Sequence, residues 1–342
     1  MMLARAPGFW DRPGSLPGRL LAPIGWVVGE ITLARMARPG VGVDVPVLCV
    51  GNPTMGGAGK TPTAIALLDA LARRGAHPFA LLRGHGGREK GPLRVDLVHH
   101  DASQVGDEAL LLARHAPTIV SRDRLTGARL AVAQGASHVV MDDGFQNPAL
   151  LKDASVLVID AGGGIGNGQV LPAGPLRAPM APQMARADGV LVVGEGTAGG
   201  DAAHQAGARL IWSGRLEPDP AAVRALQGQR LLAFAGIGRP EKFFATLQAM
   251  GARIVERHAF PDHHPYRPEE IAALMRRAQA AGLQAVTTQK DMVRLSGAAF
   301  ASLRADLHTV VVRLVLNDPA ALDTLIDHAE AAFAARQALS IR

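Results

Sequence analysis

A glycine-rich segment that ends in Lys and Thr is the clearest chemical feature of the sequence. Residues 47–63 read VLCVGNPTMGGAGKTPT, which combines an apolar strand, a turn with several glycines and the start of an amphipathic helix. Backbone N–H groups in such a turn and at a helix N-terminus bind phosphate oxygens, and glycine allows the close approach. We therefore predict a phosphate-binding loop in which Lys60 contacts the terminal phosphates of a nucleotide and Thr61 offers its hydroxyl to Mg²⁺. The predicted nucleotide contacts are Thr54, Met55, Gly56, Gly57, Ala58, Gly59, Lys60 and Thr61.

One position of this loop departs from the usual pattern. The pattern is G-x-x-x-x-G-K-[ST], and Thr54 stands where its first glycine belongs. The alternative is a glycine-rich connection that contains Gly-Lys-Thr by chance. Because an apolar strand precedes the loop and a helical pattern follows it, we favour the phosphate-binding interpretation.

Carboxylates that could hold the metal follow another apolar run. Residues 137–146 read SHVVMDDGFQ, which predicts a strand that carries Asp142 and Asp143 to the carboxyl edge of a sheet. Ligands of open α/β sheets bind at that edge, and phosphoryl-transfer enzymes hold Mg²⁺ there with Asp. Asp160, after a further apolar run, is a weaker candidate. Asp-Gly is also a common turn pair, but with the phosphate loop present we favour Mg²⁺ binding by Asp142 and Asp143.

The elements that must position these residues alternate along the first part of the chain. Short apolar runs predict strands, and segments between them, such as 60–74 and 108–113, predict helices. This alternation is typical of an α/β fold with a doubly wound, mostly parallel sheet of the P-loop NTPase type. The predicted strands are residues 46–51, 78–83, 137–142, 155–160 and 189–194.

A second, smaller α/β domain is predicted in the rest of the chain. With 342 residues, the chain exceeds the usual size of a single core. A Gly/Ala-rich, weakly patterned stretch at 196–208 and a turn-rich segment at 217–220 mark the change in composition. We therefore expect a P-loop domain at 1–216 and a smaller domain at 217–342 that closes over the active site.

The elements of this second domain are also marked. Pro240 and Pro268 open amphipathic helices, and residues 319–338 predict an Ala-rich terminal helix. The strands predicted here are residues 230–235, 252–256, 284–287 and 308–316.

The composition excludes several classes of protein. With 48% hydrophobic and 19% charged residues, the chain is neither disordered nor collagen-like. A single cysteine, Cys49, excludes a disulfide framework and favours a reducing, cytoplasmic setting. The net charge of +6 would suit an anionic partner, but the basic residues are scattered and Tyr occurs once. Because nucleic-acid binders need charge runs and stacking aromatics, we expect no nucleic-acid partner.

The N-terminal segment, residues 19–40, holds the longest apolar stretch near either end of the chain. Its uninterrupted part spans about ten residues, whereas crossing a bilayer takes about 20. No small-residue cleavage site follows it, so a secretory signal is not indicated. Two interpretations remain, an Arg-flanked helix that lies on a membrane surface or a first helix packed on the core.

A series of short motifs runs through most of the chain. Each is weak alone, but their order and spacing together are specific. The motifs are GNPTMGGAGKTP (51–62), RGHGG (83–87), VGDEA (105–109), SRDR (121–124), DDGFQNP (142–148), LPAGPLR (171–177), FAGIGRPEKFF (234–244), FPDHHPY (260–266) and TTQKD (287–291). Through them the sequence resembles the tetraacyldisaccharide 4′-kinase family, the lipid A kinases of Gram-negative bacteria. One departure is mild, since His85 stands where a Tyr is expected.

The resemblance implies a lipid kinase that uses ATP and Mg²⁺. Its reaction would transfer the ATP γ-phosphoryl group to the 4′-hydroxyl of tetraacyldisaccharide 1-phosphate, a phosphotransfer to an alcohol in lipid A biosynthesis. The resemblance also implies that Asp107 accepts the hydroxyl proton and that His263, from the second domain, is its partner. The implied enzyme is peripheral or monotopic on the cytoplasmic face of the inner membrane, with this lipid and the membrane surface as partners and no obligate protein partner.

Simpler interpretations of several residues stay open. Asp107 opens a helix, where a carboxylate is favourable as a cap, and His263 lies in a loop where a histidine is usually only solvated. Arg83, in the glycine-rich loop after a strand, suits a phosphate or substrate ligand and a plain loop cation equally. Lys290 and Asp291 could form a surface ion pair.

Other classes of function compete with the kinase. A nucleotide-driven switch or a partitioning-type ATPase without a lipid acceptor would have a similar loop, but partitioning ATPases carry a signature Lys where this chain has Met55. A GTPase would have an Asn-Lys-x-Asp element, which residues 289–291 do not match. A non-enzymatic adaptor would leave the phosphate loop and Asp142 unexplained. We therefore predict the kinase, with the P-loop switch or ATPase as the alternative.

Overall fold

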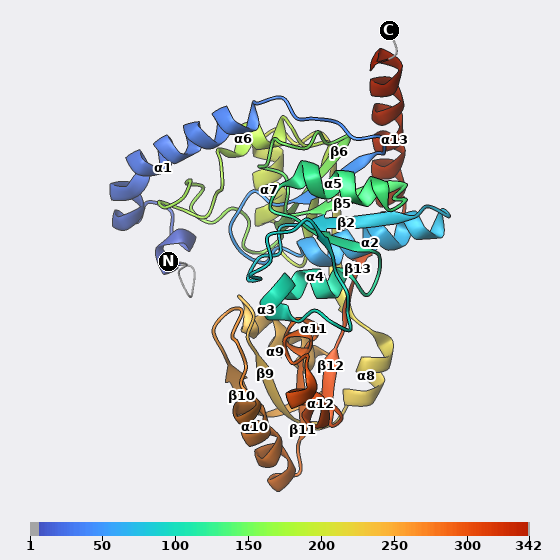
Figure 1. The fold of residues 1–342 in the computed structure, drawn as a ribbon. Helices are drawn as coiled ribbons and strands as arrows, with labels where there is room; N and C mark the ends of the chain where they lie inside the picture. The colour runs from blue at the N-terminus through green and yellow to red at the C-terminus, as the bar shows by residue number, and fades with distance from the viewer. Residues whose placement is uncertain (1–6, 341–342) are drawn as a thin grey trace.

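The computed structural model of the chain describes residues 7–340, which fold around two separate β-sheets (Figure 1). The strands of the larger sheet are β1 (Val47–Gly51), β2 (Pro78–Leu82), β3 (Leu93–Arg94), β4 (Thr118–Val120), β5 (His138–Asp142), β6 (Ala154–Asp160), β7 (Gly189–Val193), β8 (Ile211–Pro218) and β13 (Val312–Leu316). Their order is β13-β8-β7-β6-β1-β5-β2-β4-β3. Neighbours are parallel except where β3 joins β4 and β13 joins β8. The strand that leads into the phosphate loop is therefore central.

Helices cover both faces of this large sheet, so its central strands are buried on both sides. Along β1, Leu48 and Val50 pack into one hydrophobic cluster, whereas Val47 and Cys49 pack into the other. The helices that contribute to the first cluster include α2 (Lys60–Arg73), α4 (Asp107–Leu112) and α13 (Ala321–Ser340). Those of the second are α5 (Arg124–Ala133), α6 (Met180–Met184) and α7 (Ala198–Gln205). The predicted doubly wound α/β fold is confirmed.

The smaller sheet has four parallel strands and its own core. Its strands are β9 (Arg230–Ala235), β10 (Arg253–Ala259), β11 (Gln284–Thr288) and β12 (Leu307–Val310), in the order β10-β9-β11-β12. One face is covered by α8 (Pro220–Leu226) and α9 (Pro240–Ala249), and the other by α10 (Pro268–Ala280). Proline at the first turn of all three helices fits their start, since that position needs no N–H donor. The other elements near this sheet are α11 (Gln289–Arg294), η2 (Ala298–Phe300) and α12 (Ala301–Arg304).

One predicted strand is wrong as a single element. Residues 308–316 form two strands, because β12 ends at Val310 in the small sheet and β13 begins at Val312 in the large one. β13 then pairs antiparallel with β8 at the edge of the large sheet. A continuous apolar sequence gave no sign that the chain changes sheets within it.

Several elements were not expected from the sequence, among them the strands β3, β4 and β8 and the helices α5, α6, α7 and α8. β3 and β4 are only two and three residues long, too short for a periodic pattern. The strand β8 is mostly half-buried or exposed and carries Arg215 and Glu217, so it lacks the apolar run of a buried strand. The weakly patterned stretch at 196–208 contains the helix α7.

The end of the chain packs on the large sheet. Leu325 and Ile326 of α13 are buried in the same cluster as β1 and α2, although the expected second domain ran from 217 to 342. We propose a domain division that follows the two sheets, with residues 7–218 and 312–340 in a large-sheet domain and residues 219–310 in a small-sheet domain.

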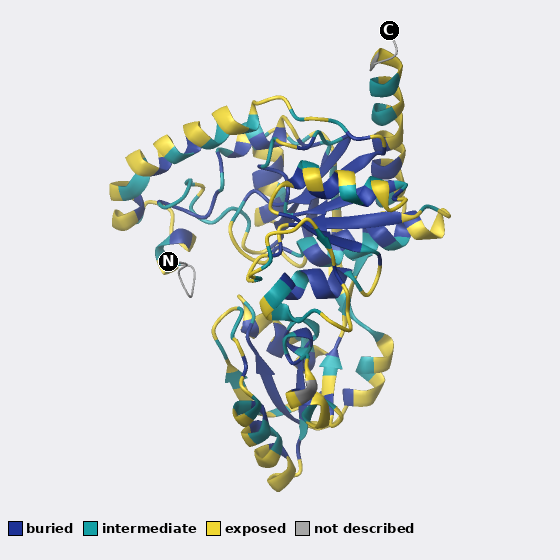
Figure 2. Cartoon of the chain, viewed as in Figure 1, coloured by how far each residue is buried: buried dark blue, intermediate teal, exposed yellow. Residues whose placement is uncertain are grey.

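The N-terminal helix α1 (Leu16–Met36) faces the body of the protein with its small residues. Gly18, Gly25 and Gly29 are its buried positions, and a Cβ at Gly25 would lie 2.6 Å from the carbonyl oxygen of Val170. Most of its large apolar side chains are exposed, as the yellow surface of this helix shows in Figure 2; Trp26, for instance, is 68% exposed. Within residues 7–340, no helix is long and apolar enough to cross a membrane. The short helix η1 (Gly8–Asp11) precedes α1, and the short helix α3 (Ala102–Val105) precedes α4.

Candidate active site

The phosphate-binding loop lies between the carboxyl end of β1 and the first turn of α2. Gly59 caps α2 with φ of 98°, a conformation that favours glycine. Lys60 Nζ donates to Asn52 Oδ1 at 3.1 Å, and Asn52 Nδ2 donates to the carbonyl oxygen of Gly56 at 3.2 Å. Through Asn52, the side chain of Lys60 is therefore linked to the loop that precedes it.

A second segment, residues 171–177, supports this loop from outside. The amide of Met55 donates to the carbonyl of Pro175 at 2.8 Å, and the amide of Arg177 donates to the carbonyl of Pro53 at 2.8 Å. Arg177 Nε also donates to the carbonyl of Thr54 at 3.2 Å. The LPAGPLR motif is thus explained as a brace for the loop, a role that its sequence alone does not reveal.

The first predicted metal carboxylate lies beside the loop. Thr61 Oγ1 donates to Asp142 Oδ2 at 3.0 Å, because β1 and β5 are parallel neighbours that end at the same edge. Asp142 Oδ1 is buried and has no hydrogen-bond partner in the described structure. Burial, followed by the charge of Glu108, raises the pKa of Asp142 to about 7. An oxygen pair of this kind fits a divalent cation, whose charge would offset the burial of the carboxylate.

The metal site would draw few ligands from the protein itself. Among residues 7–340 no group of three or more His, Cys, Asp or Glu is placed to hold a metal ion. Mg²⁺ in phosphoryl-transfer enzymes is held by one or two protein oxygens together with phosphates and water. The hydroxyl of Thr61 and the carboxylate of Asp142 are protein oxygens of the kind that such a site uses.

Asp143, the second predicted metal carboxylate, is hydrogen-bonded to Arg177. Its two oxygens accept hydrogen bonds from Arg177 at 2.6 and 3.1 Å, and Lys60 Nζ lies 3.9 Å from Oδ1. Burial alone would raise the pKa of Asp143, but the charges of Lys60 and Arg177 lower it to about 2. Asp143 has φ of 57°, rare for a residue other than glycine. The structure thus brings Asp142 to Thr61 and Asp143 to Arg177.

The two residues expected to handle the proton meet between the two sheets. Asp107, in the first turn of α4, has its Oδ2 3.3 Å from His263 Nδ1, which comes from the loop between β10 and α10. The carboxylate is only 3% exposed. Burial alone would raise the pKa of Asp107, but the hydrogen bond from His263 and the charges of Lys290 and Arg294 lower it below its usual range. The same hydrogen bond raises the pKa of His263.

A third residue of this cluster, Arg294, was missed in the sequence. Its Nε donates to Asp107 Oδ2 at 2.9 Å, and its Nη1 donates to Asp291 Oδ1 at 2.9 Å. Arg294 lies on α11 three residues after Asp291, so the two side chains share one face of the helix. That spacing was the available signal, but an Arg on a short helix is usually a surface residue.

Lys290 and Asp291 do not form a surface ion pair with each other. Lys290 Nζ instead donates to Glu108 Oε1 at 2.9 Å, across the gap between the two sheets. Asp291 is fully buried and accepts hydrogen bonds from Tyr266 and Gly236. The TTQKD motif therefore serves the contact between the domains.

Asp160, the weaker metal candidate, forms a separate ion cluster. It pairs with Lys242, and Arg239 Nη1 lies 3.1 Å from its Oδ1. Both cations stand at the start of α9 in the small-sheet domain. Burial alone would raise the pKa of Asp160, but the hydrogen bond from Lys242 lowers it. This second contact also joins the two domains beside the phosphate loop.

Comparison with known proteins identifies the family. The model of the family described as tetraacyldisaccharide-1-P 4′-kinase matches residues 18–331. The chain belongs to this family. It is 61% identical to the tetraacyldisaccharide 4′-kinase of Xanthobacter autotrophicus, over 97% of this chain and 99% of the relative. It is 55% identical to that of Azorhizobium caulinodans, over 98% of this chain and 100% of the relative.

A solved structure supports the same fold. The crystal structure of LpxK from Aquifex aeolicus in complex with ATP matches with a TM-score of 0.69 and 23% identity, over 91% of this chain and 99% of that one. Membership of the tetraacyldisaccharide 4′-kinase family confirms the resemblance seen in the motifs. It favours the kinase over a nucleotide-driven switch or a partitioning-type ATPase.

The motif RGHGG begins directly after β2, at the carboxyl end of that strand. Arg83 follows β2, the neighbour of β5, and is exposed. The ring of His85 lies 5.5 Å from that of His263 in an edge-to-face arrangement with 70° between the planes. His85, which stands where a Tyr was expected, therefore contacts His263.

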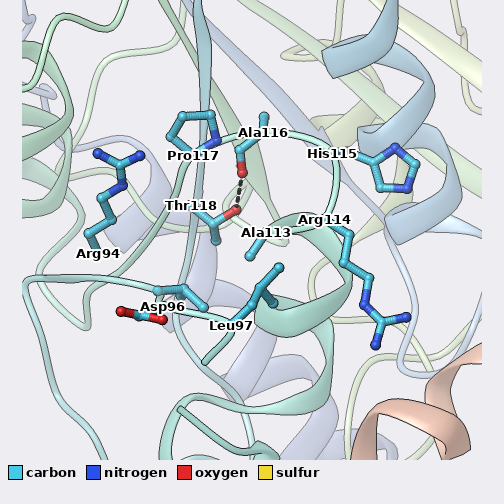
Figure 3. Close-up of a pocket in the computed structure, with 10 residues that line it drawn as sticks. Arg94, Asp96, Leu97, Ala113, Arg114, His115, Ala116, Pro117 and Thr118 are labelled. Carbon is cyan, nitrogen blue, oxygen red and sulfur yellow. Dashed lines mark hydrogen bonds between the residues drawn. The ribbon is translucent and has the colours of Figure 1, made fainter. Parts of the chain in front are cut away.

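A cavity of about 690 Å³ lies away from these residues (Figure 3). It is lined by the segments around Arg94 to Leu97 and Ala113 to Thr118, beside β3, β4 and the end of α4. None of the predicted site residues lines it.

Proposed function

We infer that the chain transfers the γ-phosphoryl group of ATP to the 4′-hydroxyl of tetraacyldisaccharide 1-phosphate, the lipid A precursor from which its family takes its name. The observation that carries this inference is that the match to the kinase family includes both the phosphate loop and the Asp107–His263 pair. α4, which carries Asp107, packs against α2 of the loop. The charge of Glu108, next to Asp107, also acts on Lys60 and Asp142.

The phosphate loop would bind ATP as its residue types suggest. Its backbone N–H groups and the N-terminus of α2 face the phosphates, and Lys60 contacts the terminal ones. Thr61 and Asp142 are the protein oxygens that would hold Mg²⁺. When bound, Mg²⁺ neutralises charge on the β- and γ-phosphates. Asp143 could bind the same Mg²⁺ only if it broke its hydrogen bonds with Arg177. We therefore propose that Asp143 instead positions the side chains of Arg177 and Lys60.

The Asp107–His263 pair would take the proton from the 4′-hydroxyl. The family resemblance makes Asp107 the acceptor, but its contacts favour a different division of labour. A carboxylate with a lowered pKa is a weak base, whereas an imidazole with a raised pKa is a good one near neutral pH. With Nδ1 of His263 turned towards Asp107, Nε2 is the ring nitrogen left to accept the proton. Asp107 then orients His263 and stabilises the imidazolium.

The two domains would close over the acceptor. His263, Lys290 and Arg294 come from the small-sheet domain and meet residues of α4. Arg239 and Lys242 of the same domain meet Asp160 at the end of β6. Transfer of a phosphoryl group depends on exclusion of water and in-line placement of the reactants more than on covalent chemistry. Closure of the two domains would supply both. Arg83, exposed at this edge, is our candidate for a substrate contact.

The lipid acceptor calls for a membrane surface. We propose that α1 docks the chain, as a peripheral or monotopic protein, on the cytoplasmic face of the inner membrane, where ATP and the lipid are both available. The support is the inverted pattern of α1, which buries glycines and exposes large apolar side chains.

Transfer of label to lipid tests the proposed function. The purified chain would be incubated with ATP labelled at the γ-phosphate, Mg²⁺ and the disaccharide 1-phosphate lipid, and the lipid fraction separated by chromatography. We expect label in the lipid and little ATP turnover without it. Equal ATP hydrolysis with and without lipid, and no labelled lipid, would support an ATPase instead.

A further inference from the structure

Three nitrogen atoms, from the side chains of Arg294 and His263, meet at one oxygen of Asp107. Arg294 donates to Oδ2 through Nε at 2.9 Å and also through Nη2. His263 Nδ1 lies 3.3 Å from the same oxygen. The side chain of Arg294 is 6% exposed and that of Asp107 is 3% exposed, so the ion pair is almost completely shielded from water. A buried pair of this kind fixes both partners, because separating them leaves a charge without compensation.

Arg294 is itself held by the small-sheet domain. Its Nη1 donates to Asp291 Oδ1 at 2.9 Å and to the carbonyl oxygen of Gly236. Asp291 in turn accepts hydrogen bonds from the Tyr266 hydroxyl at 2.9 Å, from the Gly236 amide at 3.0 Å and from Thr288 Oγ1 at 2.6 Å. Every one of these partners belongs to the small-sheet domain. The guanidinium thus has a set position that does not depend on Asp107.

We propose that Arg294 is a positioning residue for the phosphotransfer reaction, which aligns the Asp107 carboxylate with His263 when the small-sheet domain lies against α4. The inference rests on the proposed function. Asp107 comes from the large-sheet domain and His263 from a loop of the other one, so their geometry depends on how the domains meet. Arg294 links the two, since it grips Asp107 and lies 3.5 Å from His263 Nδ1. A planar guanidinium donates from several nitrogens in a fixed fork, which a lysine cannot reproduce.

The charge of Arg294 adds a second effect to its geometry. The other charged or titratable groups around Asp107 are Glu108 on α4, Lys290 and Asp291 on α11, Asp262 and His263 in the β10–α10 loop, and His85 after β2. Removing one positive charge from this set raises the pKa of Asp107. It also leaves Asp107 Oδ2 to His263 alone, which raises the pKa of His263. Both changes move the acidic limb of the pH–rate profile to higher pH.

The test compares Arg294→Gln with Arg294→Lys in the lipid-labelling assay. Because a misplacement of about 1 Å in an active site costs about 100-fold in rate, we expect Arg294→Gln to lower kcat by roughly that factor. KM for ATP should stay near the wild-type value, since the phosphate loop is untouched. The acidic limb of kcat/KM should move to higher pH in Arg294→Gln. Arg294→Lys should recover part of kcat and keep the wild-type limb, because it restores the charge but not the fork.

A milder variant and a matched control complete the test. Tyr266→Phe removes one hydrogen bond from Asp291 and should lower kcat slightly, in the same direction and without change in KM for ATP. If Arg294→Gln does not fold, as judged by thermal unfolding and ATP binding, Tyr266→Phe and Arg294→Lys decide the question. Arg277→Gln, which breaks an exposed pair with Glu256 on the same domain, should match the wild type.

Three results would overturn the inference. The first is a wild-type kcat and pH profile in folded Arg294→Gln. If Arg294→Gln does not fold, a wild-type kcat and pH profile in both Tyr266→Phe and Arg294→Lys has the same meaning. The second is a loss confined to KM for ATP. The third is an equal loss in Arg277→Gln, which would indicate a general effect on the domain. A wild-type chain that labels no lipid overturns the proposed function itself and with it any part of Arg294 in that reaction.

Discussion

Asp142 Oδ2 accepts a hydrogen bond from Thr61 Oγ1 at 3.0 Å, while its other oxygen is buried without a hydrogen-bond partner in the described structure. A buried polar group left in this way costs about 1–3 kcal/mol, and more when it is charged. A cation at this oxygen would remove the cost. The hydrogen bond therefore links the phosphate loop to the carboxylate that we propose as a ligand of Mg²⁺.

Lys60 and Asp142 should each be essential for transfer. We expect Lys60→Ala and Asp142→Asn to lower kcat about 1000-fold, because one removes charge from the terminal phosphates and the other weakens Mg²⁺ binding, and single charge-stabilising groups contribute about this much in such sites. Lipid labelling over a Mg²⁺ titration measures both, and Asp142→Asn should need more Mg²⁺.

A matched variant checks that the loss is specific. Asp69→Asn changes an exposed carboxylate of α2 that lies 3.2 Å from His115 and should leave transfer unchanged. Near-wild-type turnover in Lys60→Ala would contradict the phosphate-binding interpretation of the loop.

The Asp107–His263 pair should behave as one unit. We expect Asp107→Ala and His263→Ala to lower kcat strongly while ATP binding is kept, since the pair lies outside the phosphate loop. The double variant should be hardly worse than either single one, because each change already breaks the pair. Steady-state kinetics of the four proteins gives the coupling. Losses that multiply in the double variant would mean that the two residues act independently.

The titration of His263 should report its contact with Asp107. A carboxylate favours the charged imidazolium, so the pKa of His263 lies above its ordinary value of about 6.5 in the wild type. Asp107→Asn removes that charge and should lower the pKa of His263. NMR titration of the histidine side chains measures it, with the His263 signal assigned by its loss in His263→Ala. An unchanged pKa in Asp107→Asn would argue against the contact.

Local patterns predicted which residues of the proposed nucleotide site lie together, because they are close in sequence or at strand ends. The loop from Thr54 to Thr61 needs only a strand before it and a helix after it. Asp142 could be placed beside the loop because parallel strands end at one edge of the sheet. Arg177 could not be, since it reaches the loop through a long irregular segment with no periodic pattern.

The contact between the domains could not be predicted from the periodicity of the sequence. Arg294 and Lys290 pair with Asp107 and Glu108 on another domain, and nothing in the spacing of either segment states that they meet. Only the family resemblance placed His263 near Asp107. The change of sheet at Val311 was missed for a related reason, because the apolar pattern is the same whichever sheet buries it.

The surface of α1 should bind membranes. Its exposed apolar residues include Leu20, Ile24, Trp26, Val27 and Ile31. Three exposed arginines can meet anionic headgroups at about 1 kcal/mol each: Arg19 and Arg35 in α1, and Arg38 two residues after its end. We expect charge reversal of these arginines, or Trp26→Glu with Val27→Glu, to move the chain from anionic vesicles to the soluble fraction in a flotation assay.

Catalysis separates this docking from a role of α1 in folding. A short-chain, water-soluble acceptor does not need the membrane, so the altered chains should still phosphorylate it at the wild-type rate. Charge reversal at Arg209, Arg253 and Arg276, which are exposed and lie outside α1, changes the net charge equally and should leave flotation intact if the position of the arginines matters. Because α1 buries glycines against residues such as Val170, its outward side chains can be changed without disturbing that packing. If the α1 variants still float with the vesicles, the membrane contact lies elsewhere on the protein.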